Sequence, residues 1–169
     1  NENGDTDTWD LNYSFNTNSG DQVAALDTDL NGGNNDDWLI TPQITLTGNE
    51  IMNFFYTVLS SGEPNDFQVL LSTTGVDPLD FQDTLMFLAS YNNTTYQDST
   101  IDLSAYTGDV YIAFHVPAGG LDGWRLYIDD VCFDVCIPTA GQDGENDVCR
   151  ADGLFDLNPS IVKGQENGA

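Results

Sequence analysis

Basic residues are almost absent from this 169-residue chain. It contains 3 Lys and Arg residues against 28 Asp and Glu residues, which gives a formal net charge of −25. Such a surface repels phosphate backbones and anionic lipids, so nucleic-acid or membrane binding by a basic patch is excluded. No apolar run reaches the length of about 18 residues that a membrane span needs, and the sequence therefore predicts no insertion into a bilayer.

The same scarcity restricts the chemistry that the chain can perform. His115 is the sole histidine, so a Ser-His-Asp or Cys-His site would have to use it. Lys163 lacks the glycine-rich context of a phosphate-binding loop. Composition leaves open a chemistry based on carboxylates alone, as in glycosidases. Since no catalytic motif is present, we expect the chain not to be an enzyme.

Cysteine is also scarce. Three cysteines allow three single pairings, and the spacing of Cys136 and Cys149 favours a bridge that closes the polar segment between them. Cys132 is then a buried small apolar residue. The acidic composition, rich in Asn, Thr and Gly, is typical of secreted proteins. The polar N-terminus is no signal peptide, so we expect a mature fragment or an excised domain.

What the chain does contain is alternation of apolar and polar residues. One face of the segment 52–58 carries Met52, Phe54, Tyr56 and Val58, and the segments 67–71 and 110–116 alternate in the same way. Further strands are expected at 22–26, 38–46, 84–91 and 95–103, separated by turns rich in Gly, Asn and Pro. No segment has a convincing helical periodicity. The pattern predicts an all-β fold, an antiparallel β-sandwich.

The last predicted strand contains an irregularity. Its apolar phase slips by one residue at Asp129-Asp130: before the slip the phase holds Trp124, Leu126 and Ile128, and after it Val131, Phe133 and Val135. A β-bulge produces a slip of this kind. Two adjacent carboxylates are costly to bury in part, and a bound cation would offset that cost.

Other acidic residues also suggest a cation site. Oxygen-bearing side chains alternate at Asn3, Asp5 and Asp7, and Ca²⁺ takes six to eight oxygen ligands. Asp27 and Asp37 flank a loop of glycines and asparagines. The alternatives are a solvated acidic terminus and carboxylates that cap strand ends. The candidate metal ligands are Asn3, Asp5, Asp7, Asp27, Asp37, Asp129 and Asp130.

Several tyrosines fall outside the predicted core phases. A platform that stacks on sugar rings would use Tyr91, Tyr96, Tyr111 and Tyr127. Arg125 or His115 would donate hydrogen bonds to the sugar hydroxyls. The alternative is that the tyrosines pack with a wet hydroxyl and that His115 is solvated.

Four segments together resemble a known family. Residues 36–44 resemble the signature DDWLITPxI, residues 102–108 resemble DLSAYAG, and residues 110–115 and 126–131 resemble VYIAFRH and LYIDDV. In this order they are similar to the cleaved-adhesin, or choice-of-anchor J, family of secreted and cell-surface proteins of Bacteroidetes. That family is similar to MAM-type jelly rolls.

The resemblance implies a jelly-roll domain over residues 1–137, with 138–169 as a short C-terminal extension, a linker or the start of a following module. It implies a non-catalytic adhesion module, secreted or on the cell surface and stabilised by Ca²⁺. Asp5 and Asp7 match the family's calcium run, whereas Glu2 and Asn3 depart from it. Expected partners are a glycan, a host or matrix protein, and other modules of the same polypeptide. The alternative function is a carbohydrate-binding module appended to a polysaccharide-degrading enzyme.

Overall fold

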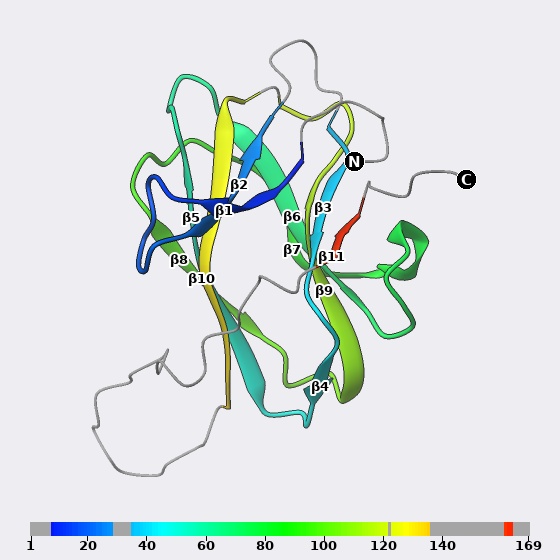
Figure 1. Ribbon diagram of the computed structural model, residues 1–169. Helices are drawn as coiled ribbons and strands as arrows, with labels where there is room; N and C mark the ends of the chain where they lie inside the picture. The colour runs from blue at the N-terminus through cyan, green and yellow to red at the C-terminus, as the bar shows by residue number, and fades with distance from the viewer. Residues whose placement is uncertain (1–7, 29–34, 122, 136–160, 164–169) are drawn as a thin grey trace.

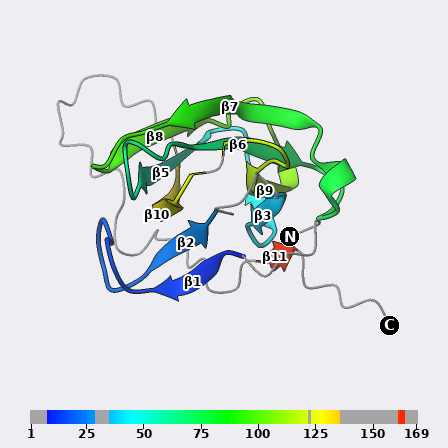
Figure 2. The ribbon, with the colours of Figure 1, turned by 90° about the horizontal axis from the view of Figure 1, so that it is seen from above.

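The computed structural model describes residues 8–28, 35–121, 123–135 and 161–163. These residues form eleven strands and one short 3-10 helix, Pro78–Asp80. All strand pairings in this part of the chain are antiparallel, and the strands form two sheets packed face to face (Figures 1 and 2). The predicted all-β sandwich is therefore confirmed.

The first sheet has the strand order β1-β2-β10-β5-β8 and lies toward the left of Figure 1. Its strands are β1 (Asp10–Tyr13), β2 (Val23–Asp27), β10 (Arg125–Val135), β5 (Glu50–Val58) and β8 (Gln97–Asp102). The sequence analysis did not predict β1.

The second sheet has the order β11-β3-β9-β6-β7, with β4 also paired to β9. Its strands are β11 (Ile161–Lys163), β3 (Asp37–Ile40), β9 (Gly108–Val116), β6 (Asn65–Ser72), β7 (Asp83–Tyr91) and β4 (Ile44–Leu46). The expected single strand over 38–46 is wrong, because the ladder breaks at Pro42, which has no N–H to donate.

Most connections cross from one sheet to the other. The chain changes sheet from β2 to β3, from β4 to β5, from β5 to β6 and at each of the three connections between β7 and β10. This repeated crossing is the double-sheet arrangement of a jelly roll. The two sheets consequently share one interior, and the connecting loops gather at the two ends of the sandwich.

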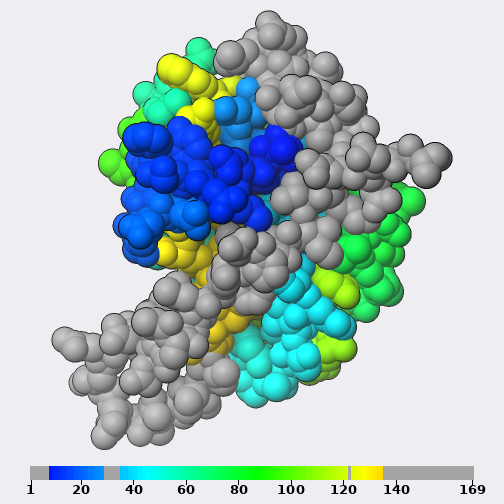
Figure 3. All heavy atoms as spheres, in the orientation of Figure 1, coloured from blue at the N-terminus to red at the C-terminus, as the bar shows by residue number. Residues whose placement is uncertain are grey.

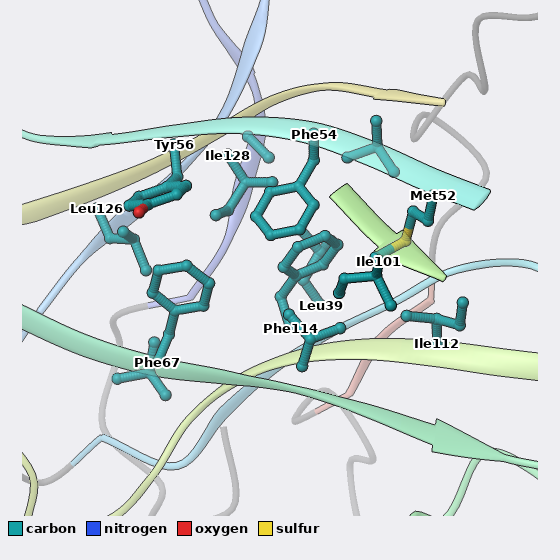
Figure 4. Close-up of a cluster of buried hydrophobic side chains, with 14 of the residues drawn as sticks. Leu39, Met52, Phe54, Tyr56, Phe67, Ile101, Ile112, Phe114, Leu126 and Ile128 are labelled. Carbon is teal, nitrogen blue, oxygen red and sulfur yellow. The ribbon is translucent and has the colours of Figure 1, made fainter. Parts of the chain in front are cut away.

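The interior is built from the inward phases of both sheets (Figure 4). Met52, Phe54, Tyr56 and Val58 all lie in the core cluster, as their alternation predicted. Phe54 meets Phe114 of the opposite sheet edge-on, with ring centroids 5.0 Å apart. Edge-on aromatic pairs of this kind add stability beyond the area that they bury.

The slip in β10 is a β-bulge, as predicted. The pairing of β10 with β5 shifts between Asp129 and Cys132, and Asp130 has a left-handed φ of 48°. Because of the extra residue, Ile128 before the bulge and Val131 after it both reach the core. Trp124 departs from its predicted phase, since 49% of its surface is exposed.

Two further expectations concern the end of the chain. Cys132 is disulfide-bonded, so the predicted Cys136–Cys149 bridge is wrong, because three cysteines cannot supply both pairs. The boundary at residue 137 stays a prediction, since 136–160 lie outside the described residues; Ile161–Lys163 pair with β3.

In the part of the chain that the structure describes, no helix is long and apolar enough to cross a membrane.

Candidate functional site

The predicted N-terminal metal ligands Asn3, Asp5 and Asp7 lie outside the described residues. Trp9, which follows them closely in sequence, is buried in the core cluster. Among the residues that the structure describes, no three His, Cys, Asp or Glu side chains gather to hold a metal ion. The calcium site at the N-terminus therefore stays a prediction.

A group of buried polar side chains closes one end of the sandwich. Asp37 at the start of β3 is 1% exposed and pairs with Val116 of β9. β6 pairs with the other edge of β9. Gln68 of β6 lies opposite His115, and continuing this antiparallel register by one residue sets Phe67 opposite Val116. Asn65, two residues before Phe67, therefore lies on the same inward phase as Asp37, near the end of the core.

The two sheets are joined at this end by a hydrogen bond between polar side chains. The hydroxyl of Thr28, just after β2, donates to Oδ1 of the fully buried Asn65 at 2.9 Å. Asn35, just before β3, is also fully buried. Hydroxyl, amide and carboxylate oxygens thus lie where the apolar core ends. Oxygen atoms of these kinds are the ligands that a hard cation such as Ca²⁺ binds.

The connection between β9 and β10 is clamped onto the start of β6. The backbone N–H of Leu121 donates to Oδ1 of Asp66 at 3.1 Å. A Cβ at Gly120 would overlap the carboxylate of Asp66, and one at Gly123 would overlap the amide of Asn65, so this close approach requires glycine. Burial raises the pKa of Asp66, partly opposed by the bond from Leu121.

Asp129 and Asp130 hold another loop in place. Asp129 Oδ2 accepts a hydrogen bond from the backbone N–H of Asn18 at 2.6 Å. The carboxylate of Asp130 accepts from the Asn18 side-chain amide at 2.7 Å and from the Ser19 hydroxyl at 2.5 Å. Burial raises the pKa of Asp129. These two predicted metal ligands lie in the first sheet, whereas Asp37 lies in the second.

Asp27 is engaged by Arg125, its neighbour across the β2–β10 ladder. The guanidinium donates from Nε and Nη2 to the two carboxylate oxygens, the latter at 2.6 Å. Nη1 donates to the hydroxyl of Tyr13, and Arg125 Cζ stands 4.6 Å from the centre of the Tyr13 ring. Together these contacts raise the pKa of Arg125, with the bond to Asp27 as the largest cause.

Two of the predicted ligand-binding tyrosines belong to this same outer face of the first sheet. Tyr127 is 1% exposed and packs with Val23, Ala25 and Tyr13. Tyr96 packs against the same cluster, and its hydroxyl donates to the carbonyl of Asn16 at 2.6 Å. Burial raises the pKa of both hydroxyls. With its ring covered, Tyr127 supports its neighbours and offers no face for stacking.

Tyr91 and His115 belong to the other sheet and do not join this group. Tyr91 lies against the core, with its ring centroid 4.6 Å from that of Phe67 and 4.9 Å from that of Tyr56. The expectation of a solvated His115 is wrong, because the side chain is stacked on Trp38 and the residue is 8% exposed. Asp36 and Gln68 flank its two ring nitrogens.

Sequence reasoning missed Tyr13 and Phe15, which complete the aromatic part of this outer face. Their signal was an alternation of apolar residues at 9, 11, 13 and 15. A register shift between Asp10 and Tyr13 separates the two ends of this run, so that Leu11 packs on the core and Tyr13 joins the outer cluster.

Comparisons with known proteins agree with this architecture. The family model described as Cleaved Adhesin Domain matches residues 1–133. Hemagglutinin A of Porphyromonas gingivalis is 32% identical over 130 residues, and its counterpart in strain W83 is 35% identical over 133 residues. Each match covers 66% of this chain but only 5–6% of the relative's length.

Solved structures show the same fold. The K1 cleaved adhesin domain of Lys-gingipain from P. gingivalis W83 superimposes with a TM-score of 0.64 at 21% identity, over 78% of this chain and 86% of that domain. The K3 domain of the same protein gives a TM-score of 0.60 at 22% identity, over the same shares. On the match over residues 1–133, this chain belongs to the cleaved adhesin domain family.

Proposed function

We propose that this chain is a non-catalytic adhesion module of a secreted or cell-surface protein, which binds a glycan or a host or matrix protein. The observation that carries the proposal is the family match over residues 1–133, together with relatives that are named hemagglutinins. The matched segment makes up only 5–6% of the length of these relatives, which is consistent with one module among several.

Adhesion can be tested directly with immobilised protein. Beads coated with the chain should be retained on erythrocytes, or on surfaces coated with collagen or fibronectin, more strongly than beads coated with albumin. The multivalent coating matters, since many weak contacts on one bead give a measurable avidity. Retention no better than that of albumin on all three surfaces would contradict the proposal.

We also propose that Ca²⁺ stabilises the module. The described residues fit such an ion in their chemistry, because Asp37 and the other buried oxygen-bearing side chains of Thr28, Asn35 and Asn65 lie where their strands begin or end, at one end of the core. Asp37 would hold the ion together with the N-terminal ligands Asn3, Asp5 and Asp7. The ion would supply positive charge to a chain whose formal charge is −25, and so reduce repulsion among its carboxylates.

The test is calorimetric titration of Ca²⁺ into chelator-treated protein, with melting curves before and after. Because an ion that binds only the folded state adds stability, a calcium concentration 100-fold above Kd should contribute about 2.7 kcal/mol. Mg²⁺ at the same concentration serves as the control for non-specific screening of charge. No heat of binding and an unchanged melting temperature would refute the calcium proposal and leave the adhesion proposal standing.

A further inference from the structure

We infer that the outer face of the first sheet carries a binding site for a neutral, pyranose-containing glycan, formed by Tyr13, Phe15, Asp27 and Arg125. The inference rests on the proposed adhesion function and specifies both its site and its class of ligand. These residues come from β1, from the loop that follows it, from β2 and from β10. The β1–β2 hairpin, in dark blue, is open to solvent on the face seen in Figure 3.

An exposed aromatic ring is the first element of the site. Phe15 is 71% exposed, and its ring centroid lies 6.0 Å from that of Tyr13 with the planes inclined by 59°. Exposing so large an apolar ring to water forgoes free energy that burial would gain. A ring placed in this way offers an apolar surface on which the C–H face of a sugar can pack, and ligand sites combine such surfaces with a few polar groups.

The polar groups are supplied by the Asp27–Arg125 pair. Each carboxylate oxygen of Asp27 accepts one guanidinium N–H, and the side chain is still 51% exposed. A carboxylate has about four acceptor positions and a guanidinium five donors, so both groups keep capacity for further hydrogen bonds. Two oxygens in one plane suit adjacent hydroxyls, which are the groups that a pyranose presents.

The loop that carries Phe15 is fixed before any ligand arrives. Asn16 is bound through its carbonyl to Tyr96, and Asn18 is bound to Asp129 and Asp130. Asn16 and Asp130 both hold left-handed φ values, of 60° and 48°. Strained residues of this kind persist only where surrounding contacts hold them, and they cluster at binding sites. Because the loop is already ordered, binding does not incur the entropic cost of ordering it.

Charge selects the class of sugar. The formal charge of −25 disfavours the approach of an anionic glycan. At the site itself Arg125 neutralises Asp27, so a basic peptide segment gains no local ion pair there. A neutral ring rich in hydroxyls is the ligand that satisfies both conditions.

The chain provides a matched pair of variants. Phe15→Ala removes the exposed ring at the site, and Phe87→Ala removes a ring that is 79% exposed on β7, in the other sheet. The probes are gels containing galactomannan, arabinoxylan or mixed-linkage β-glucan, with polygalacturonate as the anionic comparison. At least one neutral polysaccharide should retard the wild type and Phe87→Ala. The apparent affinity of that polysaccharide for Phe15→Ala should be about tenfold lower than for the wild type, the scale of one well-placed aromatic contact.

Asp27→Asn provides a second variant, which should also weaken retardation while a melting curve reports whether the fold persists. Three results would overturn the inference: no neutral polysaccharide retards the wild type, Phe15→Ala binds as the wild type does, or polygalacturonate binds equally well. If coated beads are nevertheless retained on erythrocytes or matrix protein, only the sugar site fails. If the beads are not retained either, the adhesion proposal fails with it.

Discussion

The imidazole of His115 stacks on the indole of Trp38, with ring centroids 3.7 Å apart and planes inclined by 17°. Asp36 lies 2.9 Å from the Nε2 atom of His115 and also accepts a hydrogen bond from the indole Nε1 of Trp38 at 3.1 Å. Gln68 lies 3.0 Å from Nδ1. An imidazole that donates from Nε2 and accepts at Nδ1 satisfies both partners, so the network suits the neutral ring.

This network predicts a pH-dependent stability. Burial lowers the pKa of His115 below its usual 6.5, although Asp36 partly opposes the effect. The unfolded chain then takes up the proton at a higher pH than the folded chain, so stability is lost as the pH falls below 6.5. Between about pH 7.5 and about pH 5 the melting temperature of the wild type should fall by a few degrees more than that of His115→Gln. Equal decreases in the two proteins would show that His115 has no such role.

Glu50 should stabilise the turn before β5. Its carboxylate accepts hydrogen bonds from the Thr47 hydroxyl at 2.6 Å and from the backbone N–H groups of Thr47, Gly48 and Asn49. These bonds, with the Thr47 hydroxyl as the largest cause, lower the pKa of Glu50 from 4.5 to about 2. Glu50→Gln should cost about 1–2 kcal/mol near neutral pH, since solvent screens part of the gain.

Urea unfolding at several pH values can check the direction of this effect. Because the pKa of Glu50 is lowered from 4.5 to about 2, its negative charge stabilises the fold above about pH 4.5, and this stability is lost as the pH falls toward about 2. The free energy of unfolding of the wild type should therefore approach that of Glu50→Gln across this range. A difference that stays constant with pH would mean that the charge of Glu50 contributes nothing.

The clamp between the β9–β10 connection and β6 should not tolerate a side chain at Gly123. An added Cβ would overlap the buried amide of Asn65, which is held by Thr28. Gly123→Ala should cost about 1–3 kcal/mol through overpacking, measured by urea unfolding. Gly62→Ala is the control, because only Ser60 Oγ lies near its Cβ, at 3.7 Å. Similar stabilities for the two variants would show that the contact between Gly123 and Asn65 accommodates a methyl group without cost.

Calcium-dependent stability should depend on Asp37 and not on every acidic residue. Asp37→Asn should lose most of the rise in melting temperature that Ca²⁺ gives the wild type. Asp109→Asn, at an exposed carboxylate that binds Thr45, should keep it. Asp129→Asn should keep it as well, because Asp129 already accepts the backbone N–H of Asn18. An unchanged calcium response in Asp37→Asn would remove Asp37 from the proposed ligands.

Local pattern accounts for the strands that the sequence predicted correctly. A strand turns alternate side chains to opposite faces, so the inward positions of β5, β6 and β9 can be identified from the sequence without knowing what they pack against. The bulge at Asp130 was visible for the same reason, since one extra residue reverses the alternation. The motif at residues 36–44 and its three companions also indicated the family that the comparisons show.

The outward faces did not follow from local pattern. The sequence presented His115 and Tyr127 as outward residues, yet both are covered, one by contacts with Trp38 and the other by β1 and β2. Whether an outward position is open depends on segments distant in sequence that fold over it. No local period encodes that information.

The sequence alone determined the two inward faces, the acidic charge and the bulge, because each depends on the order of residues within a short segment. Tertiary structure alone brought Arg125 beside Asp27, 98 positions away in sequence, and anchored the loop of Phe15 to Asp129 and Asp130. Hydrogen bonds and ring contacts act over a few ångströms, so they form only after the strands have paired and the chain has crossed between the sheets.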